Sequence, residues 1–393
     1  MEEEPQPGHS GGAEAVTNLQ PNSSISIAYH PLFGPHDDLL LLELDEKLLP
    51  DILHHKVTVR GEPNEDAVLC THSTTYALKF VGNSNSVFLI PPSDLSLSNS
   101  NDEKNESANA YVLKVAPGNM ELVEVAPRLG KLKSLLIENP YRSDEDCMED
   151  MEEVEREKVG LYRWEDLVDR IQASDEELRA ELKALSAVEI NGYWRIVDEK
   201  YLDIVLSMVL HNSVLNGWSL NSLKEDKILG VLETDGFSRR IALHCLEVYG
   251  NKLVVEVGEG SCVWGLDERR VCVHFAKFVL KEGKMKMERF LELWMQRIPF
   301  GMCAKFEMLE GEVLVEKLGV ETWIRAFSVS SLPLTPAERF AALFRERQKW
   351  EGKDLQPYIR DLRVPGLSSE GLLLKYTRRT QPTMDVEPIF SAR

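Results

Sequence analysis

The sequence has 393 residues, of which 43% are hydrophobic and 28% are charged, a composition typical of a soluble globular protein with several domains. It contains no apolar run of membrane-spanning length, and its acidic N-terminus has no apolar core, so we expect neither a transmembrane anchor nor a signal peptide. The six cysteines are scattered without a Cys-x-x-Cys pair, which argues against a disulfide framework or a zinc site and fits the cytosol or the nucleus.

The net charge of −20 is distributed unevenly along the chain. From Pro333 to the C-terminus there are 11 Lys and Arg residues and 8 Asp and Glu residues, which leaves this segment at +3 and the preceding residues at −23. Because an acidic surface repels phosphate groups, the protein as a whole is not expected to coat DNA. Any contact with nucleic acid requires a local basic patch, and the C-terminal segment is the first candidate.

Residues 1–23 show no hydrophobic periodicity and are expected to form a disordered tail. Residues 24–127 are predicted to form a β domain with one short helix at residues 46–54. Turn residues at 82–85 and 117–119 and a loop rich in Ser and Asn at 96–109 interrupt the series, so that a barrel or a sandwich is favoured. The predicted strands are residues 25–30, 39–44, 56–60, 67–71, 75–80, 87–90, 110–115 and 120–125.

Several of these strands are apolar on both faces, among them residues 39–44 (LLLLEL) and 87–90 (VFLI). A small barrel buries only one face of each strand, so the other face needs a cover. Helices of the same chain can provide it in a sandwich, or the strands of a partner chain can complete a half-barrel. The residues alone leave both alternatives open.

The acidic run at residues 144–157 (DEDCMEDMEEVERE) follows a predicted helix at 128–139 that ends at Pro140. Like charges in such a block repel one another, so we interpret the run as a solvated loop. A DNA mimic or a docking segment for another protein is the alternative.

The stretch from Asp166 to Val197 predicts a helix, a tight turn, a second helix and a β-hairpin. Ser174 and Glu177 have the spacing of a capping box at the start of the second helix, and Asn191-Gly192 is a two-residue hairpin signal. This order of elements is that of a helix-turn-helix with a wing.

Looser copies of this pattern fill the rest of the chain. We therefore predict an α+β multidomain protein, in which a barrel-like or sandwich-like β domain precedes a tandem array of winged-helix units whose stacking buries their faces. In the last unit, helices are predicted at residues 336–350, 355–362 and 369–379 and a strand at 386–390. The predicted domains are the tail 1–23, the β domain 24–127, and units at 128–198, 199–266, 267–332 and 333–393.

The sequence contains none of the common motifs of nucleotide binding, nucleophilic hydrolysis or zinc proteolysis: GxxxxGK[ST], GxGxxG after a strand, GxSxG and HExxH are all absent. His244 and His274 lie in apolar helical runs and are interpreted as core residues rather than ligands. We therefore expect no catalytic residue, no metal site and no cofactor.

The charge of each predicted recognition helix bears on DNA binding, because such a helix needs cations that reach the phosphates. In the first unit this helix carries Asp175, Glu176, Glu177 and Glu181, which favours a protein-binding or spacing module. The second unit offers Arg239 and Arg240, and the third offers Lys281, Lys284, Lys286 and Arg289.

The fourth unit is the most basic, with Arg345, Arg347, Lys349 and Lys353 predicted along one helix and further cations at the end of its recognition helix. Tyr376 lies between these cations and is a candidate for stacking on a base. The alternative is a solvated helix face with salt links. The candidate DNA-binding residues are Arg345, Lys349, Lys353, Lys375, Tyr376, Arg378 and Arg379.

Several long strings of the sequence resemble the DCC family of sister chromatid cohesion proteins. These strings are AVLCTHSTTYALKFVGNSNSVFLIP (67–91), LKSLLIENPY (132–141), EDLVDRIQASDEEL (165–178), INGYWRI (190–196) and RFAALFRERQKWEGKDLQPYIRDL (339–362). The resemblance begins near Leu39 and extends over nearly all of the remaining chain.

The resemblance implies a nuclear, non-ATPase subunit of the alternative, CTF-type replication factor C clamp loader. It implies that the β domain forms a shared barrel with a small companion subunit and the C-terminus of the large ATPase subunit. It also implies that the winged helices contact DNA, that the trimer docks on the catalytic subunit of DNA polymerase epsilon, and that the complex loads or unloads the clamp PCNA and promotes cohesion. That family is described with three winged helices, whereas the pattern here gives four candidates.

A winged-helix transcription regulator is the alternative function. It would need Arg, Asn or Gln side chains that read bases from a recognition helix, and usually a dimer. The acidic helix of the first unit and the lack of a clear dimerisation element argue against it.

Overall fold

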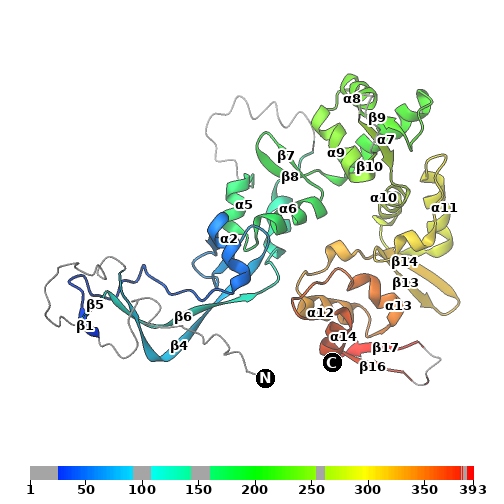
Figure 1. The fold of residues 1–393 in the computed structure, drawn as a ribbon. Helices are drawn as coiled ribbons and strands as arrows, with labels where there is room; N and C mark the ends of the chain where they lie inside the picture. Colours follow the sequence, from blue (N-terminus) through cyan, green and yellow to red (C-terminus); the bar gives the residue numbers. More distant parts are fainter. Residues whose placement is uncertain (1–24, 92–107, 143–159, 254–261, 382, 384–386) are drawn as a thin grey trace, which may run out of the picture. The chain divides into compact units, whose positions relative to one another are not determined.

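The computed structural model describes residues 25–91, 108–142, 160–253, 262–381, 383 and 387–393 (Figure 1). The predicted tail 1–23, the acidic run 144–157 and nearly all of the predicted loop 96–109 lie outside the described residues. The chain forms two compact bodies. The N-terminal body comprises Met1–Val57 and Tyr76–Val123, and the C-terminal body comprises Thr58–Thr75 and Glu124–Arg393.

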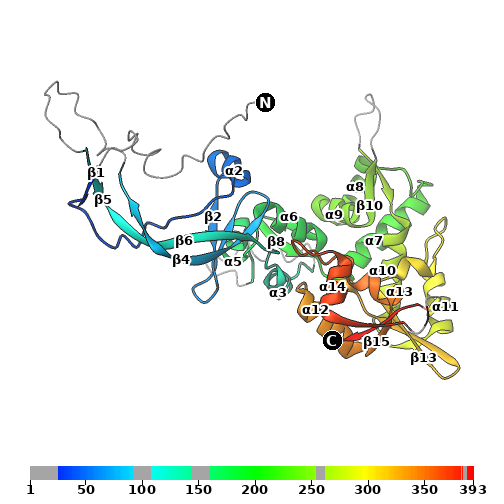
Figure 2. The same cartoon turned by 60° about the horizontal axis from the view of Figure 1, so that its bottom comes forward.

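The N-terminal body is built mainly from strands. β1 (Ile25–Tyr29) pairs in parallel with β5 (Ala108–Val112), and β4 (Thr75–Leu89) lies beside β6 (Lys114–Glu124), as both views show (Figures 1 and 2). The predicted short helix is confirmed as a 3-10 turn, η1 (Glu46–Leu48), that continues into α2 (Leu49–His54). Among the described residues no sheet closes on itself, so of the two predicted forms, barrel and sandwich, a barrel closed by this part of the chain alone is excluded.

The two turns predicted inside this region are also wrong, because residues 82–85 lie within β4 and residues 117–119 lie within β6. The glycines have a different role there. A Cβ atom on Gly118 would overlap the carbonyl oxygen of Val81, so the backbones of β4 and β6 approach each other where only glycine fits. The predicted strand at 39–44 is reduced to a single bridge between Leu42 and Met120.

The C-terminal body begins with the antiparallel pair of β2 (Thr58–Arg60) and β3 (Val68–Cys70). From residue 130 on, the described residues form four groups of helices and strands. The first group contains α3 (Gly130–Glu138), α5 (Trp164–Arg170), α6 (Asp175–Ala184), β7 (Ala187–Ile190) and β8 (Tyr193–Ile196). Helix, helix, helix and hairpin therefore follow one another as predicted, and Asn191 and Gly192 both have the positive φ that the hairpin turn requires.

The other three groups repeat one order of elements. The second contains α7 (Glu199–Leu215), β9 (Leu223–Lys224), α8 (Glu225–Thr234), α9 (Arg239–Tyr249), β10 (Gly250–Leu253) and β11 (Val263–Leu266). The third contains α10 (Glu268–Leu280), β12 (Met285–Lys286), α11 (Met287–Arg297), η3 (Phe306–Leu309), β13 (Val313–Leu318) and β14 (Glu321–Ala326). After η4 (Val329–Ser331), the fourth contains α12 (Pro336–Glu346), β15 (Lys349–Glu351), α13 (Gly352–Leu355), η5 (Gln356–Tyr358), α14 (Ser369–Tyr376), β16 (Thr377–Thr380) and β17 (Ile389–Ala392).

The sheets of these three groups have the same topology. The strand orders are β9-β11-β10, β12-β14-β13 and β15-β17-β16, so the last strand of each group is always central, between two antiparallel neighbours. In the first group the outer strand is reduced to one antiparallel bridge between Tyr162 and Trp194. All four groups therefore share one plan, with the first group the least complete.

Three hydrophobic cores hold the C-terminal body together. The first group has a core around Leu132, Leu167 and Leu178, and the fourth has one around Trp350 and Phe340. The second and third groups share one continuous core that extends from α7 to β14 and also includes Tyr141, Val188 and Val197 of the first group. None of the helices in the described part of the chain is long and apolar enough to cross a membrane.

Candidate functional site

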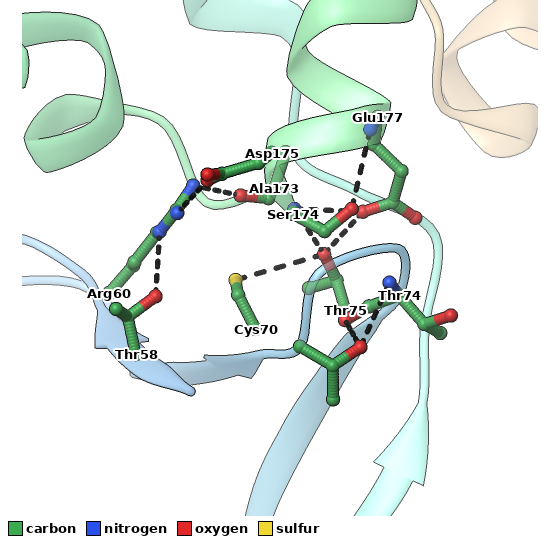
Figure 3. Close-up of polar contacts among 10 residues, drawn as sticks. Thr58, Arg60, Cys70, Thr74, Thr75, Ala173, Ser174, Asp175 and Glu177 are labelled. Atoms are coloured by element: carbon green, nitrogen blue, oxygen red, sulfur yellow. Dashed lines mark hydrogen bonds and ion pairs between the residues drawn. The ribbon is translucent and has the colours of Figure 1, made fainter. Parts of the chain in front are cut away.

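A network of polar contacts surrounds the first turn of α6 (Figure 3). The side chain of Ser174 accepts a hydrogen bond from the amide of Glu177 at 3.3 Å, and Glu177 Oε2 accepts one from the amide of Ser174 at 2.9 Å. The predicted capping box is therefore confirmed. Its unpredicted member is Thr75, whose hydroxyl accepts from the Ser174 amide at 2.9 Å and donates to Glu177 Oε2 at 2.6 Å.

Arg60 binds the same turn from the end of β2 (Figure 3). Its buried guanidinium donates to the carbonyl of Ala173 and forms an ion pair with Asp175. The Nε2 atom of His72 lies 3.2 Å from Oε1 of Glu176. The acidic turn, which we interpreted as part of a protein-binding or spacing module, contacts residues 58–75 of its own chain, and these contacts neutralise part of its charge.

The basic residues predicted along two helices of the fourth group lie on several different helices and strands. α12 ends at Glu346, so Arg345 lies in its last turn while Lys349 lies in β15 and Lys353 in α13. α14 ends at Tyr376, and Arg378 and Arg379 lie in β16 rather than on a recognition helix. Arg345 is therefore on a helix as predicted. The helical placement of Lys349, Arg378 and Arg379 is wrong, because all three lie in strands. Lys353, which we assigned to the same helix as Arg345, lies on a separate short helix.

The sheet register brings some of these cations together. Lys349 and Arg378 both pair with Ser391 of the central strand, one from each side. Arg345, Lys349, Lys375 and Arg378 are exposed and have no carboxylate partner within the described part of the chain. Lys353 differs, because it forms ion pairs with Glu351 at 2.9 Å and Glu387 at 3.4 Å.

Tyr376 is only half-buried, but one face of its ring is already covered. The ring stacks on Phe340, with centroids 5.1 Å apart and an interplanar angle of 15°. The ammonium of Lys375 lies 5.4 Å from the centre of the same ring. A base could approach only the remaining face, and the role of Tyr376 in stacking stays a prediction.

The candidate cations predicted in the second and third groups are paired with carboxylates. Arg239 lies 3.2 Å from both Asp226 and Glu233, and Arg240 lies 3.5 Å from Glu247. The same holds in the third group for Lys281 with Glu199, Lys284 with Glu316, Lys286 with Glu321 and Arg289 with Glu292. Among the candidate cations, those of the fourth group are therefore the least compensated.

Arg360 and Arg363, which were not predicted as candidates, are exposed between η5 and α14 and have no carboxylate partner among the described residues. Their signal was the charge of the segment after Pro333 rather than any motif. Arg393 was also not singled out, and its guanidinium donates to the carbonyl of Leu374 at the end of α14 at 2.8 Å.

Histidine and cysteine side chains in the described ranges form no group of three or more potential metal ligands, even when Asp and Glu are included. His274 contacts Asp203 Oδ1 at 2.7 Å through Nε2 and the hydroxyl of Tyr249 at 2.8 Å through Nδ1. Both ring nitrogens are thereby used inside the shared core of the second and third groups.

The chain matches proteins of known family over most of its length. The family model for sister chromatid cohesion protein Dcc1 matches residues 39–359. The protein named "Sister chromatid cohesion protein DCC1" in Homo sapiens is 34% identical over 351 residues, which cover 86% of this chain and 85% of the relative. Its namesake in Danio rerio is 34% identical over 379 residues, covering 92% and 90%.

More distant relatives carry the same description. The "Probable sister chromatid cohesion protein DCC1" of Dictyostelium discoideum is 26% identical over 370 residues, covering 88% of this chain and 91% of the relative. These matches confirm the resemblance found in the sequence. The chain belongs to the Dcc1 family of sister chromatid cohesion proteins.

Proposed function

We propose that this chain acts in sister chromatid cohesion as a non-catalytic subunit of the CTF-type alternative replication factor C clamp loader. Membership of the Dcc1 family supports the cohesion role, since cohesion is the activity that the relatives' names give. The clamp loader is what the family resemblance implies. In this proposal the chain acts on PCNA only indirectly, through the complex in which it is a subunit.

The observation that best supports a subunit role is the apolar surface of the N-terminal body. Tyr29 is 72% exposed, Leu40 is 74% exposed and Phe80 is 58% exposed. Open sheets with unpaired edges and exposed apolar side chains are a surface that partner strands can cover. We propose that the small companion subunit and the C-terminal segment of the large ATPase subunit provide this cover.

Co-expression tests the assembly proposal. We expect the chain alone to aggregate, and co-expression with the two partner segments to yield a soluble heterotrimer. Replacing Tyr29 and Leu40 with Ser should weaken the heterotrimer, whereas Val320→Ser changes an exposed apolar residue of the C-terminal body and should not. A monodisperse and stable monomer of the unaltered chain would contradict the proposal.

We also propose that the four groups of the C-terminal body are winged-helix units and that the fourth contacts DNA. Their common strand order and the uncompensated cations of the fourth group support this assignment. Changing Lys375, Arg378 and Arg379 to Glu should weaken binding to single- and double-stranded DNA and flatten its salt dependence. Unchanged binding would place the contact elsewhere.

Docking of the assembled heterotrimer on the catalytic subunit of DNA polymerase epsilon is the remaining part of the proposal. Cross-linking mass spectrometry of the complex from dividing cells would identify which group meets the polymerase. For the alternative function, a sequence-specific transcription regulator, selection of bound DNA from a random pool should return a motif. For a clamp-loader subunit it should return none.

A further inference from the structure

The sheet of the fourth group and its helix α14 differ in the chemistry that they present to solvent. We infer that the outer face of the sheet β15-β17-β16 binds the phosphates of a nucleic-acid backbone, and that α14 does not read bases. This inference rests on the DNA contact proposed above. It assigns that contact to the outer face of the sheet and to phosphate binding. The sequence predicted that a recognition helix makes this contact, whereas we infer that the sheet makes it.

The two faces of the sheet are distinguished by burial. Trp350 and Phe390 pair with each other and are buried in the core of the fourth group. Because side chains alternate along a strand, the neighbouring Lys349 and Ser391 point to the opposite face, and Arg378 joins them from β16. Lys349, Ser391 and Arg378 thus form one row across the three strands.

The dimensions of the row suit a chain of phosphates. Adjacent strands lie about 4.8 Å apart, which places the backbones of Lys349 and Arg378 about 10 Å from each other, with the Ser391 hydroxyl between them. The two long side chains can contact neighbouring phosphates of one nucleic-acid backbone at once. Single-stranded and double-stranded nucleic acid share this chemistry.

The charge of the row is not compensated. Neither Lys349 nor Arg378 has a carboxylate partner among the described residues, and both are exposed. The carboxylate of Glu351, on the same strand as Lys349, is held by Lys353 at 2.9 Å. A protein with a net charge of −20 that keeps two adjacent cations free has a surface complementary to phosphate.

Helix α14 has few residues that read bases, and its single cation, Lys375, lies in its last turn. Its sequence, SEGLLLKY, contains no Arg, Asn or Gln. Its exposed side chains include Leu374, at 71% exposure, and Glu370, and its Tyr376 stacks on Phe340. In a major groove this helix would bring an apolar side chain and a carboxylate to the base edges, so the binding should be independent of sequence.

The test uses the soluble heterotrimer obtained by co-expression, and compares the unaltered chain with two double variants in DNA binding measured at several salt concentrations. K349E/R378E reverses the charge of the row. K227E/K305E makes the same charge change at exposed lysines outside the fourth group. We expect K349E/R378E to weaken the affinity for single-stranded and double-stranded DNA by about tenfold or more, and to reduce the slope of log K against log salt by about 2. K227E/K305E should remain within about twofold of the unaltered chain, because these positions make no phosphate contact.

The third variant, E370A/L374A, alters the exposed side chains of α14. It should leave affinity unchanged for several unrelated DNA sequences. Equal binding by K349E/R378E and K227E/K305E would overturn the inference while leaving the proposed DNA contact in place, and so would a sequence preference that E370A/L374A removes. Absence of binding by the unaltered chain would overturn both. Melting curves of all variants identify any that fail to fold.

Discussion

The hydroxyl of Thr75 donates a hydrogen bond of 2.6 Å to the carboxylate of Glu177, although 102 positions separate the two residues in the sequence. The same hydroxyl accepts from the amide of Ser174, so one threonine joins both halves of the capping box of α6. The contact connects the first residue of β4 to the helix that opens the hairpin of the first group.

Thr75→Val should therefore loosen the start of α6. Valine keeps the β-branched shape that suits a strand, but it leaves the buried amide of Ser174 with one acceptor fewer and removes a donor from Glu177. We expect a loss of about 1–3 kcal/mol and faster amide exchange in residues 174–178, measured by hydrogen exchange with mass spectrometry. Thr74→Val is the control, because the Thr74 hydroxyl contacts only the side chain of Ser73. Equal exchange in the two variants would contradict the prediction.

Arg60 and Lys131 provide a comparison between a buried and an exposed ion pair. The Arg60 side chain is 6% exposed and bonds both Asp175 and the Ala173 carbonyl, whereas Lys131 and Glu62 are 35% and 42% exposed. Arg60→Met should destabilise the C-terminal body by about 1–3 kcal/mol, because it leaves a buried carbonyl unpaired. Lys131→Met should cost less than about 1 kcal/mol. Urea unfolding followed by circular dichroism measures both, and a larger effect of Lys131→Met would refute the ranking.

Acid should weaken the core shared by the second and third groups through His274. Burial lowers the pKa of His274 from its ordinary value of 6.5, although Asp203 and Glu199 oppose this shift and Lys277 adds to it. The unfolded chain therefore takes up a proton more readily than the folded one, so stability is full above pH 6.5 and is lost as the pH falls below it. The melting temperature should fall between pH 7.5 and pH 5.

His274→Gln isolates this contribution, since an amide can donate to Asp203 and accept from Tyr249 without changing its charge. The variant should lose less stability than the unaltered chain over the same pH range. His211→Gln, which changes an exposed histidine, is the control and should leave the pH profile as it is. Identical pH profiles for His274→Gln and the unaltered chain would rule out His274 as the titrating group.

Gly118→Ala should disrupt the pairing of β4 with β6. The new Cβ would overlap the Val81 carbonyl oxygen, so the two backbones would have to separate. In the control, Gly82→Ala, the Cβ meets only the Phe80 ring at 3.8 Å, an ordinary contact distance. We expect Gly118→Ala to reduce the yield of soluble heterotrimer on co-expression, and Gly82→Ala to leave it near the unaltered level. Equal yields would show that the strands can accommodate the added methyl group.

Signals confined to a few neighbouring residues predicted the local structure well. The capping box of Ser174 and Glu177 and the turn at Asn191-Gly192 are both present, because the backbone groups involved lie within four residues of each other. The turn predicted at Gly118 was wrong, because this glycine does not form a turn and meets the backbone of a strand distant in sequence.

For the candidate DNA-binding residues too, local sequence signals did not predict the structure formed by contacts between distant segments. Composition located them in the segment after Pro333, but helix periodicity placed Arg378 and Arg379 at the end of α14. The β-branched Thr377 and Thr380 flank them and favour the strand that pairs with β17. Pairing with residues 389–392, and hence the row formed with Lys349, depends on contacts between segments that no local pattern encodes.

The shared core of the second and third groups has a consequence for how the chain comes apart. Because α7, α9 and α10 bury their side chains in one cluster, residues 199–326 should unfold as a single cooperative block, although they contain two complete sheets. A deletion that ends between Leu266 and Glu268 would cut through this block and expose its apolar interior to solvent. A loss of cohesion caused by such a truncation would therefore reflect misfolding and degradation, and would say nothing about which half contacts a partner.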